Sequence, residues 1–224
     1  MTGFRIRQRT RAVSADHVAA FSTLPVANVS DCMSRMFAAG PALRPMHDGS
    51  PLAGPAFTVR TRPGDNLMIH KALHMAAPGD VIVVDGGGDL TNALIGELMV
   101  ATAQRRGLAG MVLFGAIRDA RTLRQGSFPV FAAGVTHRGP YKDGPGEINV
   151  PISIAGMVIE PGDLVIGDDD GVLCIGFDQV ATVLAAAQAK SAAEADMMQA
   201  IQDGTQNIDW IDAALRQKGC TFEG

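Results

Sequence analysis

The sequence predicts an α/β fold, built as a single domain over residues 1–224 whose last part, residues 178–224, is a helical extension. The first observation is the segment Asp80–Asp85, in which two aspartates flank the apolar run VIVV, a pattern typical of a strand buried on both faces. Glycines at 86–88, a helical pattern and a second apolar run at 109–114 follow it and indicate a right-handed βαβ unit. Between 147 and 177, short apolar segments alternate with Gly and Pro turns, which predicts further strands.

Composition narrows the class of protein. Of 224 residues 47% are hydrophobic and 19% are charged, which is enough apolar material for a large core. The net charge of −4 argues against a nucleic-acid partner. The three cysteines form no CxxC pair, and no apolar run approaches the roughly 18 residues of a membrane span. We therefore expect a cytoplasmic protein with reduced thiols, no signal peptide and no membrane partner.

The N-terminal third is expected to mix helices and strands. Residues 1–13 carry four arginines, and we expect a flexible, solvated arm there. Ser14 and Asp16 can cap a helix over 18–21, and a 3–4 spacing of apolar residues predicts a second helix over 29–37 that ends near 40–41. A strand at 56–60 and a helix at 66–77, which Pro78-Gly79 ends, complete this part.

The middle and the C-terminal parts follow the same reasoning. Leu94, Leu98 and Ala101 share one face of a helix that we expect from 91 to 106, with Gly107 just past its end. Strands are expected at 109–114 and 128–132. The turn at 168–171 is DDDG, whose spacing fits a hairpin better than a calcium loop. Residues 178–218 read as helical.

Three charged side chains are expected to meet at the βαβ unit. Glu97 lies in the predicted helix, Arg118-Asp119 follows the second strand, and the twenty residues 98–117 lie between them. In open α/β sheets, ligands bind at the edge where parallel strands end, and the crossover returns the chain to that edge. Free backbone N–H groups around Gly96 and at the N-terminus of the predicted helix could add an anion site.

These residue types suit the chemistry of a small acid. A guanidinium such as Arg118 holds a carboxylate or an enolate oxygen through a fork of donors. The Asp119 carboxylate is a hard ligand for Mg²⁺ or Mn²⁺, and Glu97 could move a proton to or from water or a substrate hydroxyl. The residues alone leave a second interpretation open, in which Arg118 forms a plain surface ion pair with a carboxylate.

Several stretches carry a family resemblance: GDNLMIHKAL (64–73), PGDVIVVDGGGDLTNALIGELM (78–99), RRGLAGMVLFGAIRD (105–119), GPGEINVPI (144–152) and PGDLVIGDDDGV (161–172). Together they resemble the RraA-like / 4-hydroxy-4-methyl-2-oxoglutarate aldolase family, from about Asn28 to the C-terminal helix. The most specific element is an acidic residue followed by twenty residues and Arg-Asp, which stands here as Glu97, Arg118 and Asp119.

The resemblance implies an α-β-β-α sandwich and a class II, metal-dependent pyruvate aldolase, which is a lyase. Asp119 would bind Mg²⁺ or Mn²⁺, Arg118 would hold the 2-oxo acid and stabilise its enolate, and Glu97 would position a water for proton transfer. The pyruvyl pocket would be lined by Gly96, Glu97, Leu98 and Met99. The substrate would be a 4-hydroxy-2-oxo acid, with oxaloacetate decarboxylation through the same enolate.

The resemblance also implies an assembly, a homotrimer or a homohexamer formed by two trimers. A neighbouring subunit would donate an acidic residue to each site, and Glu194 is our candidate for it.

Two departures from the aldolase pattern keep an alternative open. The strand before Arg118 ends in Phe114-Gly115, which is closer to the RraA branch, whose members bind ribonuclease E and inhibit it. The first acidic position is Glu97, where Asp is commoner. A Schiff-base aldolase is disfavoured, because none of the four lysines is expected beside the site.

Two weaker signals lie outside the motif. His70 and His74 stand four residues apart on a predicted helix, but HExxH is absent, so a structural role is favoured over one at the edge of the site. The Gly/Pro-rich stretch 137–147 could be a mobile flap over the site or a simple connection between strands.

Overall fold

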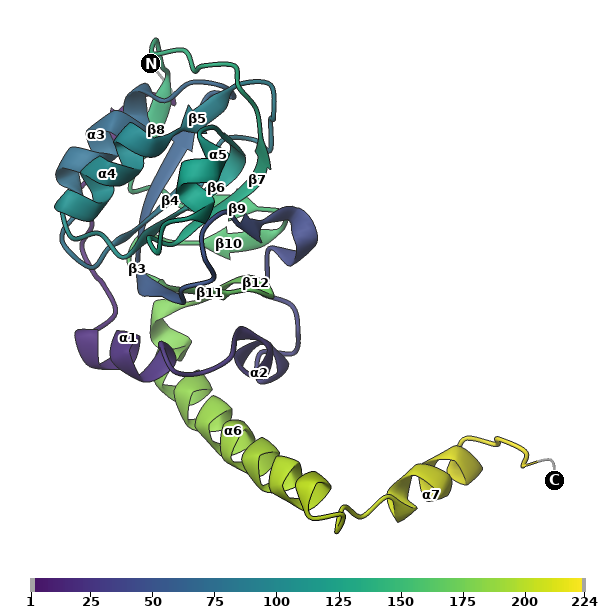
Figure 1. The fold of residues 1–224 in the computed structure, drawn as a ribbon. Helices are drawn as coiled ribbons and strands as arrows, with labels where there is room; N and C mark the ends of the chain where they lie inside the picture. Colours follow the sequence, from purple (N-terminus) through teal and green to yellow (C-terminus); the bar gives the residue numbers. More distant parts are fainter. Residues whose placement is uncertain (1–2, 223–224) are drawn as a thin grey trace. The chain divides into compact units, whose positions relative to one another are not determined.

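The computed structural model describes residues 3–222, and its centre is a ten-stranded sheet (Figure 1). Strands β3, β4, β6 and β7 run parallel in that order, with α3, α4 and α5 in the connections between them. The strands on the main path of the sheet are β1 (Arg5–Ile6), β8 (Gly146–Ile148), β3 (Leu52–Thr61), β4 (Val81–Asp85), β6 (Gly110–Ile117), β7 (Val130–Val135) and β2 (Arg44–Pro45).

The helices α3 (Leu67–Met75), α4 (Glu97–Arg105) and α5 (Ala120–Arg124) form the first layer. They pack on one face of the sheet through a continuous buried cluster, and Figure 1 shows α3 and α4 side by side. In β4 the side chains alternate: Ile82 and Val84 join this cluster, whereas Val81 and Val83 point to the opposite face. Strand β4 is therefore buried on both faces, as its unbroken apolar run predicts.

A second β layer covers that opposite face. Strands β11 (Leu164–Asp168) and β12 (Gly171–Ile175) belong to the same ten-stranded sheet but turn away from its main path into this layer. Strands β9 (Ile152–Ile154) and β10 (Met157–Ile159) form a separate two-stranded sheet beside them. The long strand β3 joins the layers, since its first residues pair with β11 and its later ones with β4. The helices α1 (Ala15–Phe21), α2 (Val26–Asp31) and the start of α6 pack on the outer face of β11 and β12. The order of layers is α-β-β-α, which confirms the predicted fold.

Many predicted elements are present. Ser14 caps α1 by accepting a hydrogen bond from the backbone N–H of His17, and β11 and β12 form the hairpin expected at Asp168–Gly171. The helix predicted over 29–37 is shorter and earlier: α2 ends at Asp31, and short 3₁₀ turns occur at Gly40–Ala42 and Phe177–Gln179.

The helix expected from 91 to 106 is wrong in its first third. Residues Ala93–Ile95 form a short strand, β5, and α4 begins only at Glu97. The 3–4 spacing of Leu94 and Leu98 suggested one continuous helix. Three buried residues are too few for a periodicity signal, and the pairing of β5 with β6 is a long-range contact.

The described part of residues 1–13 is largely exposed, but it is attached to the domain at several points. Strand β1 pairs in parallel with β8. Arg5 pairs with the buried Glu147 at 2.6 Å, and Arg9 pairs with the buried Asp80 at 2.7 Å. These ion pairs tie the arginine-rich segment to carboxylates of the domain, a property that the local composition does not reveal. Residues 1 and 2 lie outside the described part.

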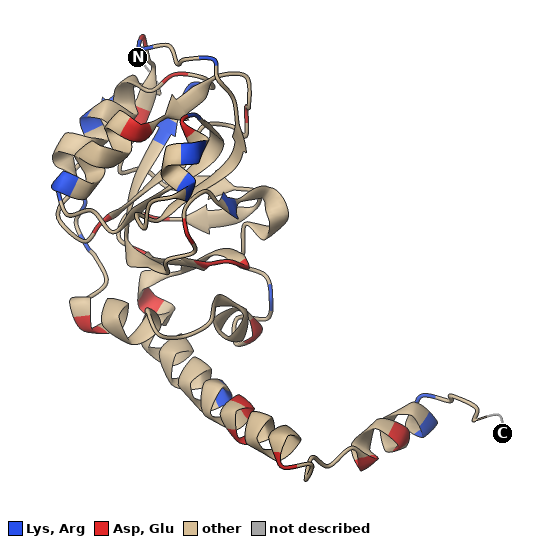
Figure 2. Ribbon diagram, viewed as in Figure 1, with Lys and Arg blue, Asp and Glu red and all other residues tan. Residues whose placement is uncertain are grey.

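The chain divides into two compact units, residues 1–187 and 188–224. Helix α6 (Val180–Gln202) crosses the boundary, and α7 (Asp209–Gln217) lies within the second unit. The expected helical tail is therefore interrupted at 203–208. Acidic and basic residues both occur along the second unit, with ion pairs at Lys190–Glu194 and Asp212–Arg216 (Figure 2). In the described part of the chain, none of the helices combines the length and the apolar character needed to cross a membrane.

Candidate active site

Strand β5 determines where α4 begins. The first half of β6 pairs with β4, up to Asp85 opposite Phe114, and its second half pairs with β5, from Ala93 opposite Ala116. The glycine turn after β4 makes this change possible, because the N–H groups of Gly86 and Gly88 both donate to the Phe114 carbonyl, at 3.1 and 3.0 Å. As a result α4 starts beside the C-terminal end of β6, at the edge where ligands bind in α/β sheets.

Arg118 and Asp119 follow β6 at this edge. The backbone N–H of Arg118 still donates to the Ile95 carbonyl at 3.0 Å, so the sheet holds Arg118 in place. Asp119 has a left-handed backbone with φ of 57°, which is uncommon outside glycine and is tolerated best by Asp and Asn. This conformation turns the carboxylate back toward α4. Its Oδ2 accepts a hydrogen bond from the N–H of Glu97 at 3.0 Å and lies 3.7 Å from Nε of Arg118.

Gly96 is required by this packing. A side-chain carbon at position 96 would overlap Oδ2 of Asp119 and would come within 3.2 Å of Nε of Arg118. The backbone of Gly96 is extended, so the requirement comes from space and not from conformation. Only glycine lets the first turn of α4 approach the Arg118–Asp119 pair this closely.

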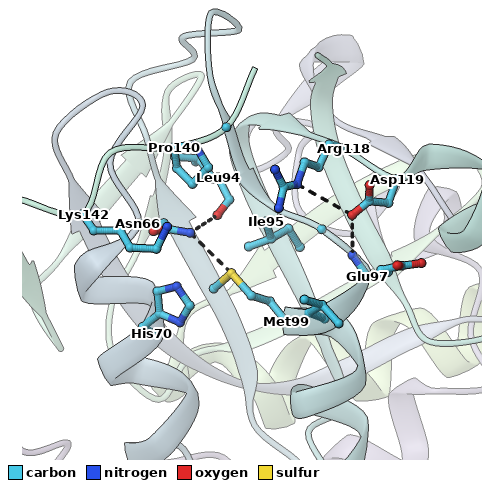
Figure 3. Close-up of a pocket in the computed structure, with 13 residues that line it drawn as sticks. Asn66, His70, Leu94, Ile95, Glu97, Met99, Arg118, Asp119, Pro140 and Lys142 are labelled. Carbon is cyan, nitrogen blue, oxygen red and sulfur yellow. Dashed lines mark hydrogen bonds and ion pairs between the residues drawn. The ribbon is translucent and has the colours of Figure 1, made fainter. Parts of the chain in front are cut away.

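The residues predicted from the motif all line one pocket of about 460 Å³, a volume in the usual range for small-molecule sites. Among these residues, the Leu98 side chain is 75% exposed. The Glu97 carboxylate is directed away from the Arg118 guanidinium (Figure 3). The lining residues are Asn66, His70, Leu94, Ile95, Gly96, Glu97, Leu98, Met99, Arg118, Asp119, Gly139, Pro140 and Lys142.

The opposite wall of the pocket was largely missed from sequence. Asn66 and His70 come from the start of α3, and Lys142 comes from the loop after β7 (Figure 3). The expectation that no lysine lies beside the site is therefore wrong. Lys142 is distant from the βαβ unit in sequence. The loop after β7 that carries it is held against the pocket by hydrogen bonds to segments far away in the chain. For His70 the less favoured alternative, a place at the edge of the site, is the one observed.

Asn66 has an unsatisfied oxygen at the pocket wall. Its side chain is buried, with an exposed fraction of 2%, and Nδ2 donates to the Leu94 carbonyl at 2.9 Å and contacts Sδ of Met99 at 3.4 Å. The buried Oδ1 has no hydrogen-bond partner among the described residues. A buried acceptor without a donor is costly, so this atom is suited to accept a hydrogen bond from a ligand or water.

The pKa of His70 lies below its ordinary value. The main cause is burial of the imidazole, and the positive charges of Lys142 and His74 act in the same direction. His70 is therefore neutral at pH 7 and presents one donor and one acceptor nitrogen.

Comparison with known proteins identifies the family to which the chain belongs. The family model RraA-like, described as Aldolase/RraA, matches residues 26–174. The chain belongs to the RraA-like family. A protein of Halalkalibacterium halodurans named "Putative 4-hydroxy-4-methyl-2-oxoglutarate aldolase" is 40% identical over 193 residues, which cover 86% of this chain and 92% of the relative.

Two comparisons with Thermus thermophilus give names for two different activities. A protein named 4-hydroxy-4-methyl-2-oxoglutarate aldolase is 37% identical over 111 residues, or 50% of this chain and 68% of the relative. The solved structure of an RNA-processing inhibitor, RraA, superposes with a TM-score of 0.62 at 32% identity, covering 67% of this chain and 92% of that chain.

The donors of this RraA-like pocket suit a divalent cation that binds through few protein ligands. Within residues 3–222, no group of three or more His, Cys, Asp or Glu side chains could hold a metal ion. Mg²⁺ usually takes only one or two carboxylates and completes its shell with waters and substrate oxygens. The Asp119 carboxylate, partly exposed at the pocket, fits that mode of binding and does not fit a zinc cage.

The Phe114-Gly115 pair has a packing role in this RraA-like chain. The pair lies inside β6, which continues to Ile117 and so extends past the predicted end of the strand. A side-chain carbon at position 115 would come within 2.6 Å of Cδ1 of Leu94, and the Phe114 ring lies against Gly88. Gly115 therefore leaves room for the Leu94 side chain of β5, and the Phe114 ring packs against the glycine turn.

Proposed function

We propose that this protein is a divalent-metal-dependent pyruvate aldolase, which cleaves 4-hydroxy-2-oxo acids such as 4-hydroxy-4-methyl-2-oxoglutarate to pyruvate and a carbonyl compound. The observation that carries the proposal is the meeting of Arg118, Asp119 and the first turn of α4 in one pocket. A guanidinium, a carboxylate and a helix N-terminus together suit a small anionic oxo acid and its counter-cation.

Arg118 and α4 would bind the pyruvyl end of the substrate. The Arg118 side chain is 45% exposed and its Nη1 lies near Gly139, so its donors would face the substrate carboxylate or 2-oxo oxygen in the pocket. The N–H of Glu97 donates to Asp119, and the N–H of Met99 donates to the Gly96 carbonyl at 3.1 Å, so the N–H of Leu98 would be the one available to the substrate. Mg²⁺ or Mn²⁺ held by Asp119 would polarise the 2-oxo group.

Bond cleavage then follows from charge. A base takes the proton of the C4 hydroxyl, the C4–O bond becomes a carbonyl, and the electrons of the C3–C4 bond move into the 2-oxo group to form pyruvate enolate. Arg118 stabilises the negative charge that develops on that oxygen. Because the Glu97 carboxylate is directed away from Arg118, we assign Glu97 to proton transfer through a water (Figure 3). Protonation at C3 releases pyruvate.

The opposite wall suits the far end of a dicarboxylate. The Lys142 ammonium supplies a second positive charge, and the Asn66 oxygen and the neutral His70 can pair with a hydroxyl group. Oxaloacetate has two carboxylates and gives the same enolate on losing CO₂, so we propose decarboxylation as a second reaction of this site.

The decisive experiment measures pyruvate release from 4-hydroxy-4-methyl-2-oxoglutarate and from oxaloacetate, with Mg²⁺ or Mn²⁺ and with EDTA. We expect turnover with the metal and none with EDTA. Arg118→Ala should lose at least about a hundredfold in turnover, the scale of losing one donor to a developing oxyanion. Arg121→Ala, which removes an exposed arginine from α5 outside the pocket, is the matched control. A wild-type rate in Arg118→Ala would refute the proposal.

Because Lys142 lines the pocket, a Schiff-base route has its own test. Borohydride added with pyruvate would trap a lysine adduct, which mass spectrometry detects. We expect no adduct at Lys142, since its proposed role is ionic. An adduct there, with activity in EDTA, would replace the metal-dependent mechanism.

We also propose that the active form is a homotrimer or a homohexamer in which Glu194 of one subunit completes the site of the next. Glu194 lies in the second unit and pairs with Lys190 at 2.8 Å. Mixing Arg118→Ala with Glu194→Gln subunits tests this idea, because shared sites would regain part of the activity. Light scattering gives the number of subunits. Absence of recovery in mixed oligomers would contradict a shared site.

A second candidate is a protein-binding inhibitor of ribonuclease E. Its support is the likeness to the RNA-processing inhibitor RraA and the Phe114-Gly115 pair in β6. The assembled Arg118–Asp119 pocket favours the enzyme, since binding a protein surface does not require it. Inhibition of purified ribonuclease E that Arg118→Ala leaves intact, with no lyase activity in the wild type, would favour the regulator.

A further inference from the structure

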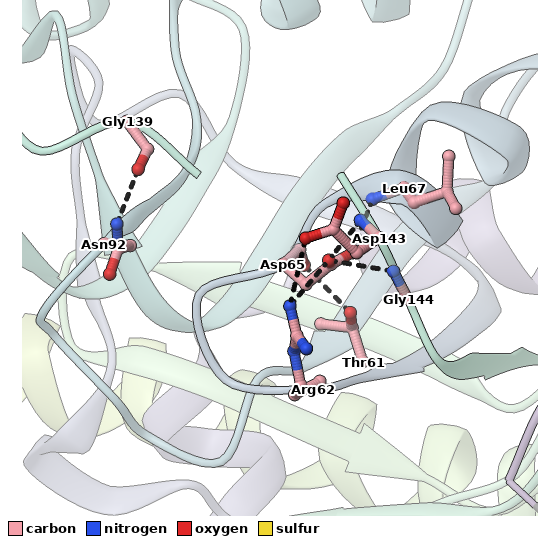
Figure 4. A network of polar contacts seen from close by, with 8 residues as sticks. All are labelled: Thr61, Arg62, Asp65, Leu67, Asn92, Gly139, Asp143 and Gly144. Carbon is pink, nitrogen blue, oxygen red and sulfur yellow. Dashed lines mark hydrogen bonds and ion pairs between the residues drawn. The ribbon is translucent and has the colours of Figure 1, made fainter. Parts of the chain in front are cut away.

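One carboxylate that the mechanism does not use belongs to Asp65, which is buried and immediately precedes Asn66 of the pocket wall. Asp65 precedes α3, and its side chain is fully buried. Four donors surround it: the N–H of Leu67 at 2.9 Å, the N–H of Asp143 at 2.7 Å, the N–H of Gly144 at 2.9 Å and the Arg62 guanidinium at 3.3 Å (Figure 4). A buried carboxylate with this many donors keeps its neighbours in one arrangement.

Two of these donors belong to the loop that carries Lys142. Oδ2 of Asp65 accepts from the residues at 143 and 144, immediately after Lys142. Tyr141, immediately before Lys142, is held through both of its backbone groups. Its N–H donates to the Gly64 carbonyl at 2.8 Å, and its carbonyl accepts from the N–H of Asn66 at 3.0 Å. The backbone on either side of Lys142 is therefore tied to the 64–66 segment.

The other end of the loop is tied to β5. Nδ2 of Asn92 donates to the Gly139 carbonyl at 2.5 Å (Figure 4). The N–H of Ala93 donates to the Arg138 carbonyl at 2.8 Å. The loop is thus attached at both ends to segments that also build the pocket. The stretch 137–147 lines the pocket through Gly139, Pro140 and Lys142, so it is more than a simple connection between strands, and its backbone is anchored at both ends.

We propose that Asp65 is a positioning residue that sets the substrate preference of the site by holding Lys142 at the pocket. The inference rests on the proposed substrate class, 2-oxo acids, and adds that a second carboxylate is recognised through the Asp65-anchored loop. An amide at position 65 has a single acceptor oxygen where the carboxylate has two, and its NH₂ group cannot accept, so the ties to Leu67 on one side and to Asp143 and Gly144 on the other can no longer all form. The Lys142 ammonium is then held less firmly opposite Arg118. Binding of the second carboxylate then weakens, while the pyruvyl end keeps its contacts.

Two ligands that cannot be cleaved make the test independent of turnover. 2-Oxoglutarate has two carboxylates, and 2-oxopentanoate has the same chain length with a methyl group at the far end. Neither has a 4-hydroxyl group. Calorimetry with the full chain and Mn²⁺ gives both dissociation constants. We expect the wild type to bind 2-oxoglutarate about tenfold more tightly, the scale of one charge-assisted contact. Lys142→Met should remove this preference.

Asp65→Asn should also remove most of the preference and change the affinity for 2-oxopentanoate little. In the double variant with Lys142→Met, the Asp65 substitution should have no further effect on the preference, because both changes act through one ammonium. Amide hydrogen exchange at 143 and 144 should accelerate in Asp65→Asn. If this variant fails to fold, Arg62→Ala, which removes an exposed partner of both Asp65 and Asp143, should shift the preference in the same direction.

Asp163→Asn is the matched control. Asp163 is also buried and also accepts backbone N–H groups, from Glu160 and Phe177, but it does not line the pocket. The Asp163→Asn substitution should destabilise the fold but keep the wild-type preference for 2-oxoglutarate over 2-oxopentanoate. Equal weakening of both ligands in Asp65→Asn, or an unchanged preference, would overturn the inference. A wild type that shows the preference and releases no pyruvate would refute only the proposed function.

Discussion

The backbone N–H of Glu97 donates to Oδ2 of Asp119 at 3.0 Å, although 22 positions separate the two residues along the chain. This hydrogen bond joins the first residue of α4 to the residue after Arg118, so the acidic residue and the Arg-Asp pair of the motif are physically connected. The twenty residues between Glu97 and Arg118 are α4 and β6 with their connection, which is the length that returns the chain to the same edge.

Gly96→Ala should disable the site without a change in any charged residue. The new methyl group overlaps the Asp119 carboxylate, so the pair must move away from α4. We expect a destabilisation of about 1–3 kcal/mol and a loss of most activity, measured by urea unfolding and pyruvate release. Gly176→Ala, where the nearest atom lies at 3.7 Å, should be nearly neutral in both assays. Full activity in Gly96→Ala would show that the contact is dispensable.

Asp119→Asn should separate the metal from the fold. The amide oxygen can still accept from the N–H of Glu97, so the left-handed turn keeps its hydrogen bond. The negative charge that attracts a divalent cation is lost. We expect Mn²⁺ affinity, followed by the paramagnetic enhancement of water relaxation, to fall at least about tenfold, with unfolding changed little. Unaltered Mn²⁺ binding would place the cation elsewhere.

The titration of His70 should respond to Lys142. Burial and the Lys142 charge lower the pKa of His70, so Lys142→Met should raise it. NMR of the imidazole protons measures this change, and Lys71→Met, on the same helix but outside the pocket, is the control. An unmoved midpoint in Lys142→Met would mean that the ammonium does not lie near the ring.

The same shift predicts the sign of a pH effect on stability. The folded-state pKa of His70 is below the unfolded value of about 6.5, so the unfolded chain takes up the proton first as the pH falls. The contribution of His70 to stability is complete above about pH 6.5 and is lost as the pH falls from there through the folded-state pKa. His70→Gln should reduce this part of the pH dependence of unfolding. An identical pH profile in the variant would contradict the linkage.

The arginines of the N-terminal segment should differ in their effect on stability. Arg9 faces Asp80, whose side chain is 3% exposed, so Arg9→Ala leaves a buried carboxylate without its cation. We expect a loss of about 1.5–3 kcal/mol in urea unfolding. Arg11→Ala removes exposed pairs with Glu160 and Asp178 and only a long contact, 4.0 Å, with the buried Asp163, and should cost less than about 1 kcal/mol. Equal costs would indicate that burial of the partner is not decisive.

Local patterns were sufficient for elements whose signal lies within a few residues. The Asp-flanked apolar run predicted β4, Ser14 predicted the start of α1, and the glycine-ended turn at 168–171 predicted a hairpin. The acidic residue and Arg118-Asp119 could also be singled out, because a right-handed crossover brings the ends of parallel strands to one edge. These features depend on backbone geometry that short-range sequence determines.

By itself, the sequence determined the layered fold, the family resemblance and the acidic and Arg-Asp residues of the pocket. Only the tertiary structure decided that β5 precedes α4, that the N-terminal arginines are paired, and that Asn66, His70 and Lys142 form the opposite wall. Each of these depends on hydrogen bonds or ion pairs between segments far apart in the chain. Residue spacing carries no record of such contacts, because they form only when separate elements pack against each other.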